Sequence, residues 1–242
     1  MRSVFRRLLG VVCVIAGAWS TSVSAAPQTS AFGSLLSSAI DRELTASWAA
    51  VRDQVEADAR ELSVAIRRPE MSADPVLARI ALKVEPLRYA PLHEKLDAVN
   101  RLVNREIQYT SDLLASGVED RWLSPSEALR IGGDCEDYSI AKYVILRALG
   151  VDEKKMRIIV LRDTDRELGH AVLTVAHKVG EVVLDNVSSA LRVDRNLPQY
   201  RPIYSIQAGA AYAHLNLPTL RRHYFTRAQI ALGDTPRSSE SP

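Results

Sequence analysis

The spacing of apolar residues changes once along this 242-residue chain, and the change lies at Gly150. Before this glycine, apolar side chains recur every three or four residues, as they do on one face of a helix. After it, apolar and polar side chains alternate, as they do in a strand with one buried face. Helices followed by an antiparallel sheet define an α+β fold.

The first part of the chain is expected to be helical. Helices are predicted over residues 35–65, 75–84, 92–107, 125–131 and 135–149. Asn100 and Asn104 lie beside the apolar stripe of the third helix, and we interpret them as polar residues of a helix surface. Residues 108–124 form a long irregular stretch, and stretches of this length are often functional.

The second part is expected to form the sheet. Strands are predicted over residues 156–161, 171–177, 181–185 and 200–206. Gly180 separates the second strand from the third, which indicates a hairpin. Residues 208–232 show no pattern that favours a helix or a strand.

The N-terminal residues are typical of a secretory signal peptide, which we predict over residues 1–26. Basic residues precede an apolar run at 8–18, and small residues follow at 23–26. The apolar run is shorter than the roughly 20 residues that a membrane span needs. Cleavage would remove Cys13 and leave Cys135 as the sole cysteine, so that no internal disulfide could form. A lone thiol in an oxidising compartment indicates a nucleophile, although a small buried residue under a helix is the alternative.

The remaining chain is long enough for one domain with a full core. We expect a mobile lead-in over residues 27–34, a single domain over residues 35–233 and a disordered tail over residues 234–242. Lys and Arg number 31 against 29 Asp and Glu, and the basic excess lies partly in the signal peptide. The composition therefore gives no indication of nucleic-acid binding.

Cys135 lies in an unusual stretch, because residues 132–138 read Gly-Gly-Asp-Cys-Glu-Asp-Tyr. The two glycines indicate a turn that leads into a helix. A helix N-terminus favours the thiolate form of a cysteine, whereas the carboxylates of Asp134, Glu136 and Asp137 disfavour it. Such a thiol is either unreactive or lies beside another group that offsets the acids.

A cysteine nucleophile needs a base within hydrogen-bond reach and a third group that orients the base. His170 begins the second predicted strand, where it can face a cleft. His177 is an odd number of residues away and faces the other side of a regular strand. Asp185 ends the third predicted strand, and the hairpin would bring it beside His170. A turn aspartate is an equal alternative for Asp185.

Taken together, these segments resemble a known family. They are Gly-Val-Glu-Asp-Arg-Trp-Leu-Ser-Pro at 117–125, Gly-Asp-Cys-Glu-Asp-Tyr at 133–138, Ala-Lys-Tyr at 141–143, Gly-His-Ala-Val-Leu at 169–173 and Leu-Asp-Asn at 184–186. The combination is similar to the bacterial transglutaminase-like cysteine proteinases, and within them to the LapG-type periplasmic proteases that process large surface adhesins. The resemblance covers residues 35–206.

The resemblance implies a transglutaminase/papain-like cysteine protease fold. It implies that Cys135 is the nucleophile, His170 the base and Asp185 the group that orients the base. Trp122 looks placed to stabilise an oxyanion, as a tryptophan can in the transglutaminase superfamily, although a packing role is at least as well supported. The backbone N–H of Cys135 is a natural donor to the same oxyanion.

The resemblance also implies that calcium binds through Asp134, Glu136 and Asp137 and offsets their charge. From the residues alone, the alternative is that Asp134 caps the helix while Glu136 and Asp137 complement its dipole. The implied function is a periplasmic endopeptidase that cleaves the N-terminal region of a large adhesin and so controls adhesin release and biofilm attachment. An inner-membrane receptor for cyclic di-GMP would inhibit it.

Two other functions remain open at this point. The same three residues could serve an acyl transferase or an amidase that acts on cell-wall peptides. A non-catalytic, calcium-dependent interaction module is the second alternative.

Overall fold

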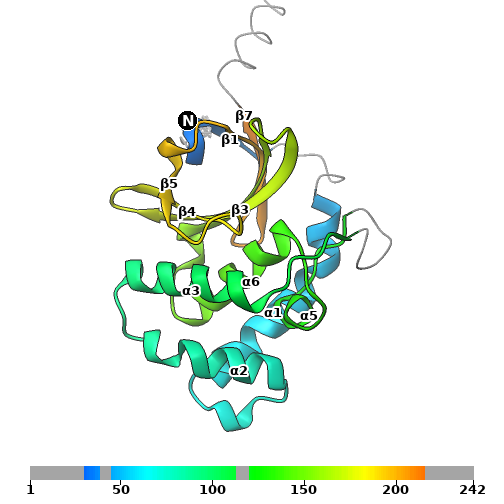
Figure 1. Ribbon diagram of the computed structural model, residues 1–242, viewed down its shortest axis with the longest axis vertical. Helices are drawn as coiled ribbons and strands as arrows, with labels where there is room; N and C mark the ends of the chain where they lie inside the picture. The colour runs from blue at the N-terminus through cyan, green and yellow to red at the C-terminus, as the bar shows by residue number, and fades with distance from the viewer. Residues whose placement is uncertain (1–29, 39–44, 113–119, 216–242) are drawn as a thin grey trace, which may run out of the picture.

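The computed structural model describes residues 30–38, 45–112 and 120–215, in which a curved antiparallel sheet packs on a layer of helices (Figure 1). The order of its seven strands is β1-β7-β6-β2-β3-β4-β5, and every neighbouring pair is antiparallel. The predicted α+β class is therefore confirmed. No helix within these described ranges is long and apolar enough to cross a membrane.

The four predicted strands are present. The strands are β1 (Leu35–Ser37), β2 (Met156–Asp163), β3 (Leu168–His177), β4 (Gly180–Leu184), β5 (Arg192–Val193), β6 (Tyr200–Gln207) and β7 (Ala210–Leu215). The predicted hairpin is the pair β3–β4, with His177 opposite Gly180. Gly180 has a φ of 121°, which a residue with a side chain rarely adopts. The sequence did not predict β1, β5 or β7.

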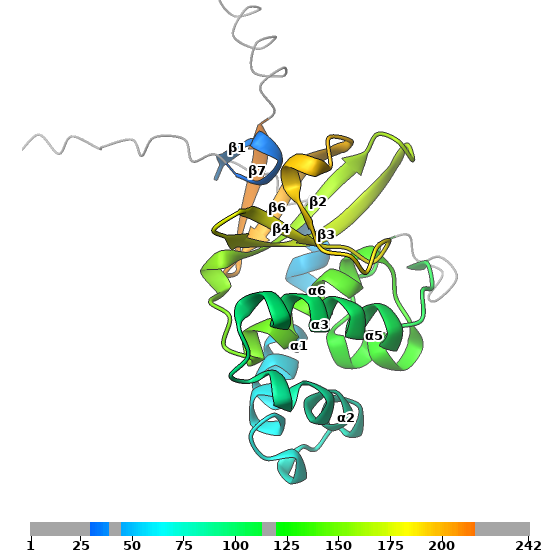
Figure 2. The same cartoon turned by 60° about the vertical axis from the view of Figure 1, so that its left-hand side comes forward.

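The helices are α1 (Ala46–Ala65), α2 (Pro75–Val84), α3 (Leu92–Glu106), α5 (Pro125–Ile131) and α6 (Cys135–Ala148). Helix α6 is the central one, because it packs against β2 and β3 on one side and against α1 and α3 on the other. Most of its residues are buried, which explains the nearly continuous apolar run after Tyr138. Helix α2 lies at the far end of the helical layer from the sheet (Figure 2).

The prediction of one helix over residues 35–65 is wrong in its first part. Leu35 to Ser37 form β1, which pairs with β7, and the described helix begins only at Ala46. Apolar spacing alone could not reveal a strand whose partner lies at the other end of the chain. Ala31 and Ser34, expected in a mobile lead-in, are buried in the domain. The predicted signal peptide and tail lie outside the described residues.

A buried histidine connects three segments at this edge of the sheet. The Nδ1 atom of His214 on β7 lies 2.6 Å from the Ser34 hydroxyl, and its Nε2 atom lies 2.8 Å from the Ser205 hydroxyl on β6. Burial, with a smaller contribution from the Arg157 charge, lowers the pKa of His214 to about 4. The folded protein therefore holds this ring neutral.

This ring should make the protein less stable in acid. The unfolded chain protonates His214 near pH 6.5, whereas the folded chain does so only near pH 4, so the unfolded state binds more protons between these values. We expect the loss of stability from this residue to be on the order of 3 kcal/mol as the pH falls through that window. Urea denaturation across this range should show the loss in the wild type and not in His214→Gln. His93→Gln is the control, since the His93 side chain is 71% exposed. The prediction would be contradicted if the difference in the free energy of unfolding between the wild type and His214→Gln did not change with pH.

Candidate active site

Cys135 is the first residue of α6, and two glycines allow the chain to reach it. A Cβ atom on Gly132 would lie 2.7 Å from the carbonyl oxygen of Gln108, and one on Gly133 would lie 2.3 Å from Oδ2 of Asp137. The Gly133 N–H donates to the same Gln108 carbonyl at 3.1 Å. The Gly-Gly pair is therefore required by close packing at the start of the helix.

His170 and Asp185 are joined by a hydrogen bond. His170 Nε2 lies 3.0 Å from Asp185 Oδ1, as the predicted hairpin requires. The Tyr200 hydroxyl donates to Asp185 Oδ2 at 2.6 Å, and the Val187 N–H donates to Oδ1 at 2.9 Å. Burial alone would raise the pKa of Asp185, but the bonds from His170 and Tyr200 lower it to about 2. Asp185 is therefore an ionised acceptor, and Nδ1 of His170 remains available to the cleft.

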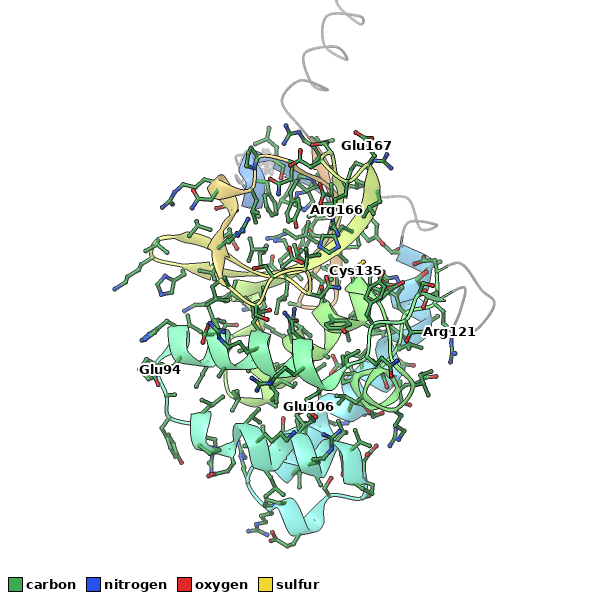
Figure 3. The ribbon with its side chains drawn as sticks, viewed as in Figure 1. Glu94, Glu106, Arg121, Cys135, Arg166 and Glu167 are labelled. Atoms are coloured by element: carbon green, nitrogen blue, oxygen red, sulfur yellow. The ribbon has the colours of Figure 1, made fainter. Side chains whose placement is uncertain are left out.

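Cys135 and His170 line the same two hollows on the protein surface. One, of about 510 Å³, is acidic and includes Asp134 and Glu136. The other, of about 300 Å³, includes Arg166 and aromatic side chains. Figure 3 shows Cys135 where the helical layer meets the sheet. An extended peptide that crossed from one hollow to the other would pass both the thiol and the imidazole.

Four carboxylates gather beside the thiol. Asp134, Glu136 and Asp137, the metal ligands that the family resemblance implies, are joined by Asp112, and one ligand atom from each lies within 4.8 Å of the others. Asp112 was missed, because it lies in the irregular stretch 108–124 and belongs to no recognisable motif. The structure thus brings the predicted acids together and adds a fourth.

These carboxylates are difficult to ionise together. Burial and the neighbouring Asp134 raise the pKa of Glu136 to about 10. Burial raises the pKa of Asp137 to about 8, although N–H groups of Leu123 and Asp134 donate to it. Burial also raises the pKa of Asp112. Without a cation, the cluster would carry protons at neutral pH.

The thiol shares this environment. Burial, and then the charges of Glu136 and Asp134, raise the pKa of Cys135 well above its ordinary value, while a hydrogen bond from the Ala171 N–H acts in the opposite direction. The thiol donates to Glu136 Oε2 at 3.3 Å. Cys135 is therefore a protonated thiol in the absence of positive charge nearby.

The donor set of the cluster fits a hard divalent cation. All four groups offer carboxylate oxygens, which calcium prefers. Oδ1 of Asp134 is buried and has no hydrogen-bond partner within the described part of the chain. The two oxygens of Asp137 accept the N–H groups of Leu123 at 2.7 Å and Asp134 at 3.1 Å, which fixes the orientation of this carboxylate. Asp137 can therefore accept N–H groups at the start of α6 and also offer an oxygen to a metal ion.

Trp122 lies at the wall of the acidic hollow and is buried. Its indole N–H donates to Asp120 Oδ1 at 3.0 Å, and its ring makes an edge-on contact with Trp48 at a centroid distance of 6.3 Å. The packing role is thus observed directly. The indole N–H would have to leave Asp120 before it could donate to an oxyanion.

The interpretation of Asn100 and Asn104 as surface residues is wrong. Asn100 is fully buried, and its amide donates to the carbonyl oxygens of Ser188 and Ser189. The amide of Asn104 donates to the carbonyl oxygen of Asp185 at 2.9 Å. Both asparagines of α3 therefore hold the loop that follows β4 and carries Asp185.

A cysteine at the start of a central helix and a histidine that lines the same hollows from the adjoining sheet form a candidate cysteine-nucleophile site. Residues 81–208 match the family model of the bacterial transglutaminase-like cysteine proteinases. Because the match covers more than half of the chain, the protein belongs to this family. No match was found among curated proteins.

Solved structures from Legionella pneumophila have the same fold. LapG is 25% identical, with a TM-score of 0.53 over 64% of this chain and 87% of the LapG chain. Calcium-bound LapG is 23% identical, with a TM-score of 0.52 over 72% of this chain and 99% of the other. EGTA-treated LapG is 22% identical, with a TM-score of 0.53 over 71% of this chain and 97% of the LapG chain.

Proposed function

We propose that this protein is an endopeptidase in which Cys135, His170 and Asp185 act as a catalytic triad. The observation that carries the proposal is the 3.0 Å hydrogen bond from His170 to Asp185 at the wall of the hollows that Cys135 lines. Nε2 is the ring nitrogen that faces the carboxylate, so Nδ1 is left for the thiol. Membership of a cysteine proteinase family supports the same roles.

The reaction would proceed through a thioester. His170 takes the proton of the Cys135 thiol, and the sulfur attacks the carbonyl carbon of the scissile bond. The imidazolium then gives its proton to the leaving amine as the C–N bond breaks. Water, deprotonated by the neutral imidazole, attacks the thioester, and the new carboxylic acid leaves while the thiol regains its proton. The Cys135 N–H at the start of α6 would stabilise the oxyanion.

We further propose that Asp112, Asp134, Glu136 and Asp137 hold calcium. Bound calcium would supply positive charge that offsets these carboxylates. That charge would remove part of the repulsion that raises the pKa of Cys135, and so favour the thiolate. LapG from Legionella pneumophila has been solved in a calcium-bound form, which supports the proposal.

The substrate and the setting follow from the family resemblance. We propose that the enzyme is exported to the periplasm and cleaves the N-terminal region of a large surface adhesin, which would control adhesin release and biofilm attachment. An inner-membrane receptor for cyclic di-GMP would inhibit it by holding it away from the adhesin. The two hollows that Cys135 and His170 both line are consistent with an extended polypeptide substrate.

A direct test is incubation of the purified protein with the exported adhesins of the same cell in the presence of calcium. We expect one defined fragment, whose new N-terminus is found by sequencing and whose mass corresponds to hydrolysis. A product in which two peptides are joined would instead identify an acyl transferase. The absence of any covalent change in every exported adhesin would contradict the proposed substrate class.

A non-catalytic calcium-dependent module has one observation in its favour, namely the raised pKa of Cys135. Iodoacetamide labelling at neutral pH distinguishes the two functions. If the protein is an endopeptidase, iodoacetamide should alkylate Cys135 of the wild type in the presence of calcium. Under the same conditions it should not alkylate Cys135 of the His170→Ala variant. A thiol that stays unlabelled in calcium would favour the module.

A further inference from the structure

The smaller hollow, of about 300 Å³, contains side chains that the proposed reaction does not use. Three of them, Tyr109, Leu168 and Val187, are apolar and yet exposed. Exposed apolar side chains that gather at one place are typical of a surface that binds another molecule. Cys135 and His170 line the same hollow, so a group bound in it would lie beside the reacting atoms.

Arg166 is the one side chain with a permanent charge among the described residues that line this hollow. It belongs to the connection between β2 and β3, and in the view of Figure 3 it lies between Cys135 and Glu167. The hollow therefore presents a cation next to exposed apolar surface.

A buried carboxylate fixes the position of Arg166. Its Nε donates to Asp163 Oδ2 at 2.6 Å, and its backbone N–H donates to Asp163 Oδ1 at 3.3 Å. The Asp163 side chain is only 4% exposed, whereas that of Arg166 is 37% exposed, so the negative end of this ion pair lies inside the protein and the positive end faces outwards. Within the described part of the chain, the two terminal nitrogens of Arg166 donate no hydrogen bond.

A role in the turn alone explains the contact of Nε with Asp163, but it does not explain the exposed apolar side chains around the guanidinium. The two terminal nitrogens form a fork whose geometry matches a carboxylate. The larger hollow offers no such partner, because Asp112, Asp134 and Glu136 line it. An acidic residue of a bound peptide therefore fits the smaller hollow and not the larger one.

We propose that the smaller hollow is a substrate subsite in which Arg166 binds the side-chain carboxylate of a glutamate or aspartate near the scissile bond. The terminal nitrogens of Arg166 donate to the two carboxylate oxygens, and Leu168 and Val187 cover the methylene groups of the same side chain. The inference rests on the proposed endopeptidase, since it names a residue class that this enzyme selects.

The first test uses alkylation of Cys135 and needs no peptide cleavage. The probes are the amides of iodoacetyl-glutamate and iodoacetyl-glutamine, which differ by one charge, and in both cases the thiolate displaces iodide. The full chain is used with calcium present, and peptide mass spectrometry separates Cys135 from Cys13. The measured quantity is the ratio of the two alkylation rates, glutamate probe over glutamine probe, so any general effect of a variant on the thiol cancels.

Arg166→Gln, which keeps a donor for Asp163 and removes the charge, should lower this ratio about tenfold relative to the wild type, because hydrogen bonds to charged groups are the stronger ones. Arg162→Gln is the matched control. Arg162 pairs with Glu167 and lines neither hollow, so its loss removes the same charge from the same region of the sheet. The ratio in Arg162→Gln should stay within about twofold of the wild type.

The second test uses the adhesin fragment whose new N-terminus locates the cut bond. We expect a glutamate or aspartate within a few residues of that bond. Its replacement by glutamine or asparagine should lower kcat/KM about tenfold for the wild type and less than twofold for Arg166→Gln, because the two changes remove the same contact.

The outcomes separate this inference from the proposed function. If the rate ratio is the same in the wild type and in Arg166→Gln while His170→Ala abolishes alkylation, the subsite is wrong and the triad stands. A loss of kcat/KM that is equally large in Arg166→Gln would also overturn the subsite. If His170→Ala is alkylated as fast as the wild type by both probes, the triad is wrong, and the subsite falls with it.

Discussion

The Cys135→Ala protein is expected to show no detectable peptide cleavage, and His170→Ala should lower kcat by about four to six orders of magnitude. Among the described residues that line the two hollows, Cys135 supplies the one sulfur, and His170 supplies the imidazole. Neither side chain fills a large part of the core, so both variants should fold. The measurement is cleavage of the proposed adhesin substrate by gel and mass spectrometry, with melting temperature recorded in parallel.

His177→Ala is the matched control for this pair. His177 lies on the same strand as His170, at the hairpin end of β3. It lines neither hollow. It should keep wild-type kcat and KM. Cleavage that survives in Cys135→Ala or in His170→Ala would show that the triad has been assigned to the wrong residues.

Removal of calcium should have the second largest effect. In EGTA, burial and the acids beside the thiol keep Cys135 protonated, so cleavage should stop and should return when calcium is added in excess. Calcium should also raise the melting temperature, because a ligand at a hundred times its Kd stabilises the folded state by about 2.7 kcal/mol. Differential scanning fluorimetry measures this without any substrate.

Single ligand variants locate the calcium effect in the cluster. Glu136→Gln and Asp112→Asn should each lose most of the calcium-dependent rise in melting temperature. Asp53→Asn, on the exposed face of α1, should keep it, since the Asp53 side chain is 90% exposed. Activity and melting temperature that are the same in EGTA and in calcium would leave only a helix-start role for these acids.

The parts of the site that could be predicted are those that local sequence encodes. The alternation of β3 and β4, with Gly180 between them, places His170 opposite the start of the loop that carries Asp185. The Gly-Gly pair and the apolar run after it place Cys135 at a helix start. Such patterns depend on residues that are only a few positions apart in the sequence. The local structure that they predict is therefore the one found in the folded protein.

The parts that could not be predicted depend on distant neighbours. Asp112 joins the acids because residues 108–110, which precede it, pair with Gly133 just before the start of α6. Asn100 has the spacing of a residue beside a helix stripe, but the loop after β4 covers it. Lys142 occupies a position that helical spacing would give to an apolar residue, and only the packed core shows that its charge is buried. In each case tertiary packing overrides the local pattern.

The pairing of β1 with β7 has a consequence for how the chain matures. Leu35 lies opposite Leu215, so the first described strand finds its place only when the last one exists. Closure of so long a loop is entropically unfavourable and belongs late in folding. A nascent chain that has reached β6 already holds every group of the cleft named above, yet its sheet still has an open edge on which another molecule could add a strand.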